Sequence, residues 1–364
     1  MSTTILHKTA ELGQSLWLDT ISRELLVSKG LDDWIEKGVL GVTTNPAIFE
    51  QAIAKMTSYD RKIQELAQQE KSSSEICETL MLQEVGAAAD VFRSVYERTG
   101  GVDGYVSLEV SPLLAADAAS TITEAVRLFS ALARPNVLIK IPATLEGIEA
   151  IETCIARGIN VNATLIFSVE QYAKTAWAYI RGLEKRATQD LSLTIASVAS
   201  VFVSRIDGAV DPLLSDKGVS ELRGRLAVDN ARLTYEKFKE IFSSKNAHWC
   251  ALFEKGARVQ RPLWASTGTK DPSYSDVLYV ENLIGPDTVN TLPLKTLNAF
   301  LDHGRVESTL ELDMEDVYAR FVRLKEAEID IEDVCESLLK KGLESFNVAW
   351  TELIESIEEK SKVR

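Results

Sequence analysis

Histidine and cysteine are scarce in this chain, and the few that occur are dispersed. The 364 residues include 3 histidines and 4 cysteines, with no His-x-x-x-His or Cys-x-x-Cys pair. Because zinc sites usually contain closely spaced pairs, we expect no metal site. Scattered cysteines form no dense disulfide framework either, so we expect buried, reduced thiols at Cys77, Cys154, Cys250 and Cys335.

Long apolar runs and an excess of positive charge are also missing. No stretch contains the roughly 20 consecutive apolar residues of a membrane span, and residues 1–8 contain no signal-peptide core. The 40 basic and 54 acidic residues give a net charge of −14, which argues against a surface for nucleic acid or anionic membrane. We therefore expect a cytoplasmic protein that handles small molecules, and any anionic substrate would need a local positive pocket.

Short apolar runs alternate with helical patterns along the chain. Eight such runs occur, at residues 15–19, 39–43, 104–109, 137–140, 159–165, 194–200, 262–266 and 277–280. This alternation is typical of repeated strand-helix units in an α/β protein. It predicts a closed (β/α)8 barrel, the TIM barrel, and the alternative is a doubly wound open sheet.

The chain is longer than the roughly 250 residues of a typical barrel, so we expect additional helices. One helical insertion is predicted at 57–98, with a break near 71–74, and a helical C-terminal extension is predicted at 314–362. No low-complexity linker separates these parts, so we expect one domain over 1–364. The extension carries an apolar stripe that should pack on the barrel, formed by Val334, Leu338, Phe346, Leu353 and Ile357.

Lys140 is the most informative residue, because it stands where a buried strand would carry another aliphatic side chain. It closes the apolar run 137–140 and is followed by Ile141 and Pro142. Burying an ammonium costs several kcal/mol unless it is paired, and burial favours the uncharged amine. An uncharged lysine can attack a carbonyl, so Lys140 is a candidate Schiff-base nucleophile. The alternative is a lysine whose stem packs while its ammonium reaches water.

Other polar residues stand at the carboxyl ends of the predicted strands, where a barrel's active site lies. They are Asp19, Thr43, Asn45, Glu109, Asn162, Thr164, Ser200 and Ser266. Taken singly, each could cap a helix or form a hydrogen bond to the backbone of a turn. Asn45 before Pro46, for example, fits a helix N-cap. Their coincidence with a lysine and two carboxylates indicates a catalytic site.

Four sequence blocks together resemble the transaldolase family. They are Gly-Val-Thr-Thr-Asn-Pro at 41–46, Ser-Leu-Glu-Val at 107–110, Leu-Ile-Lys-Ile-Pro-Ala-Thr at 138–144 and Gly-Ile-Asn-Val-Asn-Ala-Thr-Leu-Ile-Phe at 158–167. The resemblance implies a (β/α)8 barrel and a class I aldolase mechanism without metal or cofactor. It also implies a place in the non-oxidative pentose phosphate pathway. The reaction would transfer a dihydroxyacetone unit from sedoheptulose 7-phosphate to glyceraldehyde 3-phosphate, giving erythrose 4-phosphate and fructose 6-phosphate.

The resemblance also implies a role for each matching residue. Lys140 would form the Schiff base, and Asp19 would act as general base and acid on the C4 hydroxyl. Glu109 and Thr164 would hold a water for proton transfer. The positions that would line the dihydroxyacetone pocket are Thr43, Asn45, Asn162 and Ser200.

Phosphate recognition needs positive charge, and two residues of the matching motifs can supply it. Arg205 closes the motif 200–205, and arginine suits bidentate phosphate binding. Ser266 matches a phosphate-site serine, but the better-known family branch has an arginine where this chain has Gly268. Lys270 is the candidate replacement, and the alternative is a lysine on a solvated loop.

We expect sugar phosphates as partners, and a homodimer is compatible with these patterns. Two other functions remain open: an aldolase that releases free dihydroxyacetone, and a barrel that binds sugar phosphates without catalysis.

Overall fold

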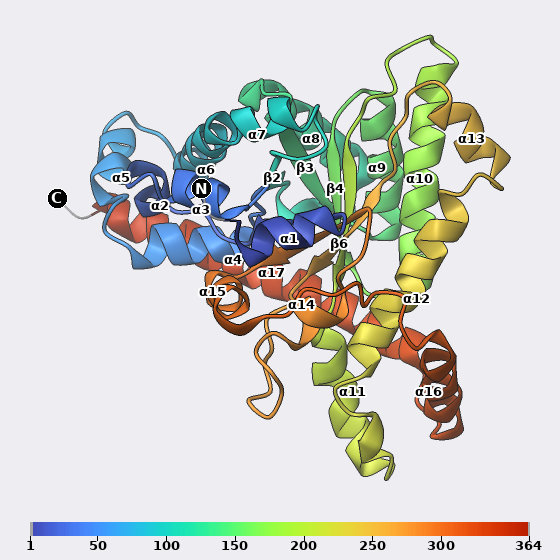
Figure 1. Ribbon diagram of the computed structural model, residues 1–364. Coiled ribbons are helices and arrows are strands. Elements are labelled where there is room, and N and C mark those ends of the chain that lie inside the picture. Colours follow the sequence, from blue (N-terminus) through green and yellow to red (C-terminus); the bar gives the residue numbers. More distant parts are fainter. Residues whose placement is uncertain (1–2, 363–364) are drawn as a thin grey trace.

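The computed structural model describes residues 3–362, so residues 1–2 and 363–364 of the predicted domain lie outside the described part. Seven parallel strands in that part form one curled sheet in the order β1-β7-β6-β5-β4-β3-β2 (Figure 1). The strands are β1 (Gln14–Leu18), β2 (Val106–Glu109), β3 (Val137–Pro142), β4 (Val161–Ile166), β5 (Ser197–Phe202), β6 (Arg261–Ala265) and β7 (Thr288–Leu292). All of them are buried, as expected for a parallel sheet covered by helices.

The extended segment 39–43, predicted as the second strand, fills the gap between β1 and β2. Val42 forms a parallel bridge to Leu18 on one side and to Val106 on the other. Backbone hydrogen bonds join Leu40 to Leu16 and to Gly104, at 2.9 and 2.7 Å. The strand order is sequential around the ring, whereas a doubly wound sheet reverses its order at a central strand. The predicted TIM-barrel-like α/β fold is therefore confirmed.

The last predicted strand, at 277–280, is wrong. The chain there forms a short helix, α14 (Leu278–Asn282), and the strand that pairs with β1 is β7. A four-residue apolar run does not distinguish a buried helical turn from a strand. β7 has the sequence Thr-Val-Asn-Thr-Leu, and its polar residues break the apolar pattern by which buried strands are recognised.

Helices follow most strands along the chain and present one apolar face to the sheet. In α10 (Val169–Ala187) the buried residues include Tyr172, Ala176, Tyr179 and Leu183, which share one face at helical spacing. Ser168 caps the start of this helix, and its hydroxyl accepts a hydrogen bond from the Gln171 amide. The other helices up to α15 and outside the 57–98 insertion are α1 (Ile5–Glu11), α2 (Arg23–Val27), α3 (Gly30–Lys37), α4 (Pro46–Phe49), a π-helix (Glu50–Ala54), α8 (Ala118–Leu132), α9 (Leu145–Ala156), α11 (Ser204–Asp216), α12 (Leu226–Ile241), α13 (Ala247–Phe253) and α15 (Leu294–His303), with 3-10 turns at Pro112–Leu114 and Ser220–Leu222.

Additional helices occupy both predicted places. The insertion contains α5 (Asp60–Ala67), α6 (Ser73–Val91) and α7 (Arg93–Arg98), and Ser72 caps α6 at the predicted break. The C-terminal extension contains α16 (Met314–Glu326) and α17 (Ile331–Lys362). α17, the long red helix of Figure 1, packs against α4, α5, α6, α11 and β4. It therefore crosses the end of the barrel at which the strands end.

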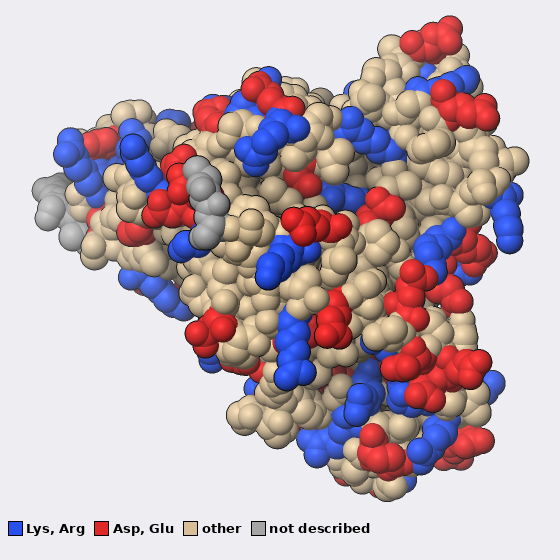
Figure 2. Space-filling model, viewed as in Figure 1, with Lys and Arg blue, Asp and Glu red and all other residues tan. Residues whose placement is uncertain are grey.

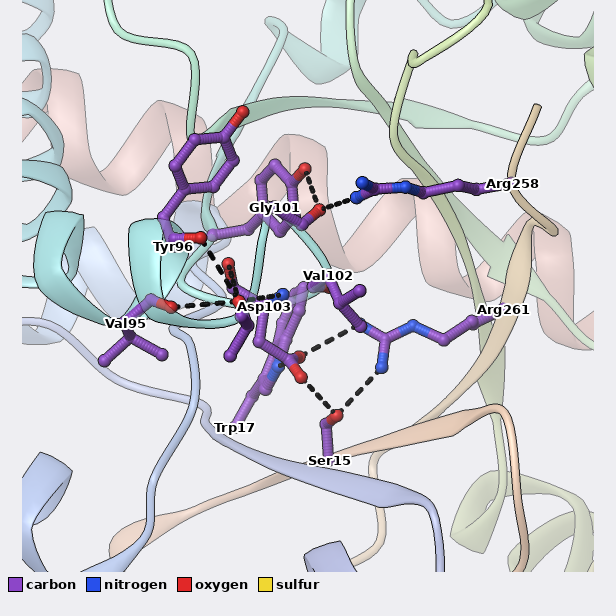
Figure 3. A network of polar contacts seen from close by, with 11 residues as sticks. Ser15, Trp17, Val95, Tyr96, Gly101, Val102, Asp103, Arg258 and Arg261 are labelled. Atoms are coloured by element: carbon purple, nitrogen blue, oxygen red, sulfur yellow. Dashed lines mark hydrogen bonds and ion pairs between the residues drawn. The ribbon is translucent and has the colours of Figure 1, made fainter. Parts of the chain in front are cut away.

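A buried polar network closes the opposite end of the barrel (Figure 3). The Arg261 guanidinium lies 3.0 Å from the Asp103 carboxylate, and both side chains are buried. The Asp103 carboxylate also accepts hydrogen bonds from the Trp17 indole at 3.0 Å and from the Ser15 hydroxyl at 2.8 Å. Ser15 and Trp17 belong to β1 and Arg261 begins β6, so the network ties the loop before β2 to two strands of the sheet.

The helices within residues 3–362 all fall short of the length and apolar character that crossing a membrane requires. On the face shown in Figure 2, acidic and basic side chains are interspersed. All four cysteines are free. Cys250 is partly exposed, so the expectation of a buried thiol is wrong at that position.

Candidate active site

Lys140 lies inside the barrel, and only 4% of its surface is exposed. Its Nζ donates a hydrogen bond to the Thr44 carbonyl at 3.1 Å and lies 3.5 Å from Glu109 Oε2. The ring of Phe346 is centred 5.9 Å from the same nitrogen. A lysine that extends its ammonium into bulk water is therefore excluded, and the amine faces the interior of the site.

Glu109 is the direct neighbour of Lys140 across β2 and β3. Burial raises its pKa from the ordinary 4.5 to about 7, although the nearby Lys140 charge opposes the shift. Neither oxygen of Glu109 has a hydrogen-bond partner within residues 3–362, and the buried Thr164 hydroxyl has none there either. Buried polar atoms without protein partners are places where an ordered water is expected.

Asp19 directly follows β1 and is half-buried. The Thr43 hydroxyl donates a 2.6 Å hydrogen bond to Asp19 Oδ1 and shares another with the Thr291 hydroxyl. Desolvation by burial raises the pKa of Asp19, while Lys140 and the Thr43 hydrogen bond oppose this effect. Asp19 is thus a carboxylate held in one orientation and made more basic than a solvated one.

Asn162 and Ser200 form a polar row on the interior of β4 and β5. Ser200 donates to Asn162 Oδ1 at 2.7 Å, and Asn162 Nδ2 donates to the Ser107 hydroxyl at 3.0 Å. Asn45 caps α4 by accepting a hydrogen bond from the Ile48 amide at 3.0 Å. Asn45 therefore has the capping role that the sequence allowed, and it also lines the pocket.

A pocket of about 150 Å³ joins most of the predicted residues at the carboxyl ends of the strands. Those that line it are Asp19, Thr43, Asn45, Lys140, Ser200, Arg205, Ser266 and Lys270. The other three are not in its wall. Glu109 contacts Lys140, Asn162 contacts Ser200, and Thr164 lies opposite Pro142 on the strand beside Lys140.

Arg205 and Lys270 give the pocket local positive charge. Arg205 lies in the first turn of α11, and its guanidinium is 5.1 Å from the centre of the Phe202 ring. Arg205 is half-buried, and among residues 3–362 neither it nor Lys270 has an acidic side chain within ion-pair distance. Ser266 lies between them in the chain, and its hydroxyl is 3.1 Å from that of Ser204. These groups form a candidate phosphate site, with Lys270 at its exposed rim.

Comparison with known proteins agrees with this geometry. A family model described as Transaldolase/Fructose-6-phosphate aldolase matches residues 16–357. The chain is 46% identical to a transaldolase of Trichodesmium erythraeum, over 100% of this chain and 99% of that relative. It is 45% identical to a transaldolase of Thermobifida fusca, over 97% of each chain. The chain belongs to the transaldolase/fructose-6-phosphate aldolase family.

Sequence reasoning missed several pocket residues of this family member, among them Thr291, Phe202, Ser345 and Phe346. Thr291 is the penultimate residue of β7, a strand that the apolar pattern misplaces to residues 277–280, and Phe202 ends β5 two residues after Ser200. A correct prediction of the last strand at Thr288–Leu292 would have placed Thr291 near its carboxyl end, and therefore at the site. Ser345 and Phe346 come from α17, and Phe346 was assigned to an apolar stripe without a role in the site. No local signal distinguishes Phe346 from the other apolar residues of that stripe.

Proposed function

We propose that this protein is a transaldolase that transfers a dihydroxyacetone unit from sedoheptulose 7-phosphate to glyceraldehyde 3-phosphate. The single observation that carries the proposal is Lys140, a buried amine 3.5 Å from a buried carboxylate at a pocket with two unpaired cations. A cytoplasmic location is part of the proposal, because charged sugar phosphates do not cross bilayers unaided.

Schiff-base formation requires several proton transfers at the Lys140 nitrogen. The amine attacks the ketose C2, the carbonyl oxygen takes a proton, and the hydroxyl of the carbinolamine then leaves as water. The Glu109 carboxylate contacts Lys140 but accepts no hydrogen bond within residues 3–362, and together with the Thr164 hydroxyl it would hold the water that relays these protons. A pKa of about 7 lets Glu109 accept and return a proton near neutral pH.

Asp19 is the base for the cleavage step. It removes the proton of the C4 hydroxyl, the C3–C4 bond breaks, and the electron pair moves into the iminium to give an enamine on Lys140. The aldose leaves, and the enamine carbon then attacks the acceptor aldehyde while Asp19 returns its proton. The hydrogen bond from Thr43 orients the Asp19 carboxylate both for removal of the C4 hydroxyl proton and for its return.

The remaining residues bind the two ends of the sugar. The hydroxyl and amide groups of Thr43, Asn45, Asn162 and Ser200 offer donors and acceptors to the hydroxyls of the dihydroxyacetone unit. Arg205, Lys270 and Ser266 bind the phosphate, and the arginine supplies directional hydrogen bonds. The phosphate thereby supplies the negative partner that the half-buried Arg205 lacks, and Lys270 adds positive charge at the rim.

Borohydride reduction in the presence of fructose 6-phosphate, followed by peptide mapping, tests the proposal. We expect an adduct on Lys140, and its absence would favour a barrel that binds sugar phosphates without catalysis. Assays with and without erythrose 4-phosphate then separate transferase from aldolase. Sustained turnover only with the acceptor supports transfer, and equal turnover in both assays supports an aldolase that releases dihydroxyacetone.

A further inference from the structure

The C-terminal helix α17 supplies one wall of the catalytic pocket. Ser345 and Phe346 line the pocket, and Phe346 is only 3% exposed. The centre of its ring is 5.9 Å from Lys140 Nζ. The nitrogen also has two polar contacts, the Thr44 carbonyl and the Glu109 carboxylate. Phe346 therefore gives the reacting nitrogen an apolar neighbour that comes from outside the barrel strands.

The position of Phe346 is fixed by contacts on both sides of it along α17. Gly342 lies one turn earlier on the same face, where an added Cβ would approach Leu165 Cδ2 at 3.0 Å and Arg205 Nη1 at 3.5 Å. A glycine inside a helix costs about 0.5–1 kcal/mol of stability relative to alanine. Here the missing side chain permits α17 to approach Leu165 and Arg205 closely. Further along, the Lys360 ammonium donates to the Met56 carbonyl at 2.7 Å and to the Asp60 carboxylate at 2.6 Å.

We propose that Phe346 is a specificity-determining residue that retains the dihydroxyacetone unit on Lys140 until an acceptor aldehyde arrives. This inference rests on the proposed transaldolase function. After cleavage the unit is an enamine, and its carbon reacts either with an aldehyde, which is transfer, or with a proton. In the second case the protonated iminium adds water at C2, the carbon-nitrogen bond breaks, and free dihydroxyacetone and the lysine amine result.

The loss pathway needs a proton at the enamine carbon, from protonated Asp19 or from a water, and then a water that adds at C2. The Phe346 ring occupies the side of the site that α17 covers, and it offers no hydrogen bond to orient a water there. Exclusion of water from a closed site is a recognised way to protect reactive intermediates from hydrolysis. The water assigned to Glu109 and Thr164 serves the proton transfers at the Lys140 nitrogen and at the C2 oxygen. The Phe346 ring limits the entry of further waters into the site.

Four proteins test the inference: the wild type, Phe346→Ala, Phe346→Leu and Leu353→Ala. Leu353 is a matched control, because it is fully buried on the same helix but does not line the pocket. The measured quantity is the steady rate of glyceraldehyde 3-phosphate release from fructose 6-phosphate without acceptor, divided by the rate with erythrose 4-phosphate. We expect Phe346→Ala to raise this ratio about tenfold, since it admits water, and Phe346→Leu to stay near the wild type.

A second measurement reports the protonation itself. Fructose 6-phosphate recovered from heavy water should carry deuterium at C3 several times faster with Phe346→Ala than with the wild type. If Phe346→Ala does not fold, Phe346→Val takes its place with the same expectation.

An unchanged ratio and unchanged deuterium incorporation in the small-residue variant would overturn the inference. An equal rise with Leu353→Ala would also overturn it, because general loosening of α17 would then explain the effect. These results differ from a failure of the proposed function, in which the wild type itself gives no borohydride adduct on Lys140 and no acceptor-dependent turnover.

Discussion

Glu109 and Lys140 lie directly opposite each other in β2 and β3, with Glu109 Oε2 and Lys140 Nζ 3.5 Å apart and both side chains almost fully buried. Each residue lowers the cost of burying the other, and removal of one partner would leave an uncompensated polar group in the barrel. The same contact places a group that titrates near neutral pH beside the amine that must lose and regain protons.

The raised pKa of Glu109 predicts a pH dependence of stability. Between its ordinary 4.5 and about 7, the folded protein holds a proton that the unfolded chain releases. The free energy of unfolding should therefore fall as pH rises through this interval. In Glu109→Gln this contribution is absent, so the fall should be shallower than in the wild type. Urea unfolding at several pH values measures both slopes, and identical slopes would contradict the assignment.

Lys140→Arg should abolish turnover and borohydride trapping while the fold persists. A guanidinium stays charged and cannot form the imine. Turnover assays, peptide mapping and circular dichroism measure the three properties. Lys174→Arg, an exposed lysine paired with Glu170, is the control and should behave as the wild type. Residual transfer with Lys140→Arg would show that another amine carries the intermediate.

Asp19→Asn should slow carbon-carbon cleavage but still permit imine formation. The amide cannot take the proton of the C4 hydroxyl, whereas the steps at Lys140 depend on Glu109 and its water. A borohydride adduct with fructose 6-phosphate should form in this variant, with little glyceraldehyde 3-phosphate released. If no adduct can be trapped, the step assigned to Asp19 is wrong.

Arg205→Ala should raise the Michaelis constant for fructose 6-phosphate about tenfold to a hundredfold, because a hydrogen bond to a charged group contributes about 1.5–3 kcal/mol. The constant for unphosphorylated fructose should change little. Arg181→Ala removes an exposed arginine paired with Glu152 and provides the control. Equal losses for both sugars would remove Arg205 from the phosphate site.

Asp103→Ala should destabilise the protein by about 3–5 kcal/mol, because it leaves the buried Arg261 guanidinium without its carboxylate. Asp90→Ala removes the exposed partner of Arg134 and should cost at most about 1 kcal/mol. Urea unfolding of both variants checks this difference. Similar costs would mean that the network of Figure 3 contributes no more than a surface pair.

Much of the barrel and of the site could be predicted because parallel strands end at the same edge of the sheet. Lys140, Glu109 and Asp19 each follow an apolar run, and this local pattern is enough to bring them together. β7 departs from the apolar pattern because Thr288, Asn290 and Thr291 are buried polar residues, and the Asn290 oxygen and the Thr291 hydroxyl find hydrogen-bond partners in neighbouring segments that no local pattern predicts. The segment 39–43 was found, although Val42 alone forms bridges there.

The sequence by itself determined which side chains stand at the strand ends, because the alternation of apolar runs and helices fixes the barrel locally. It therefore determined the lysine, the two carboxylates and the arginine. Only the tertiary structure decided that α17 crosses this end and places Phe346 beside Lys140. Helical periodicity shows which face of α17 is buried, but the path of the helix over the barrel depends on contacts between residues far apart in the chain, such as Lys360 with Asp60.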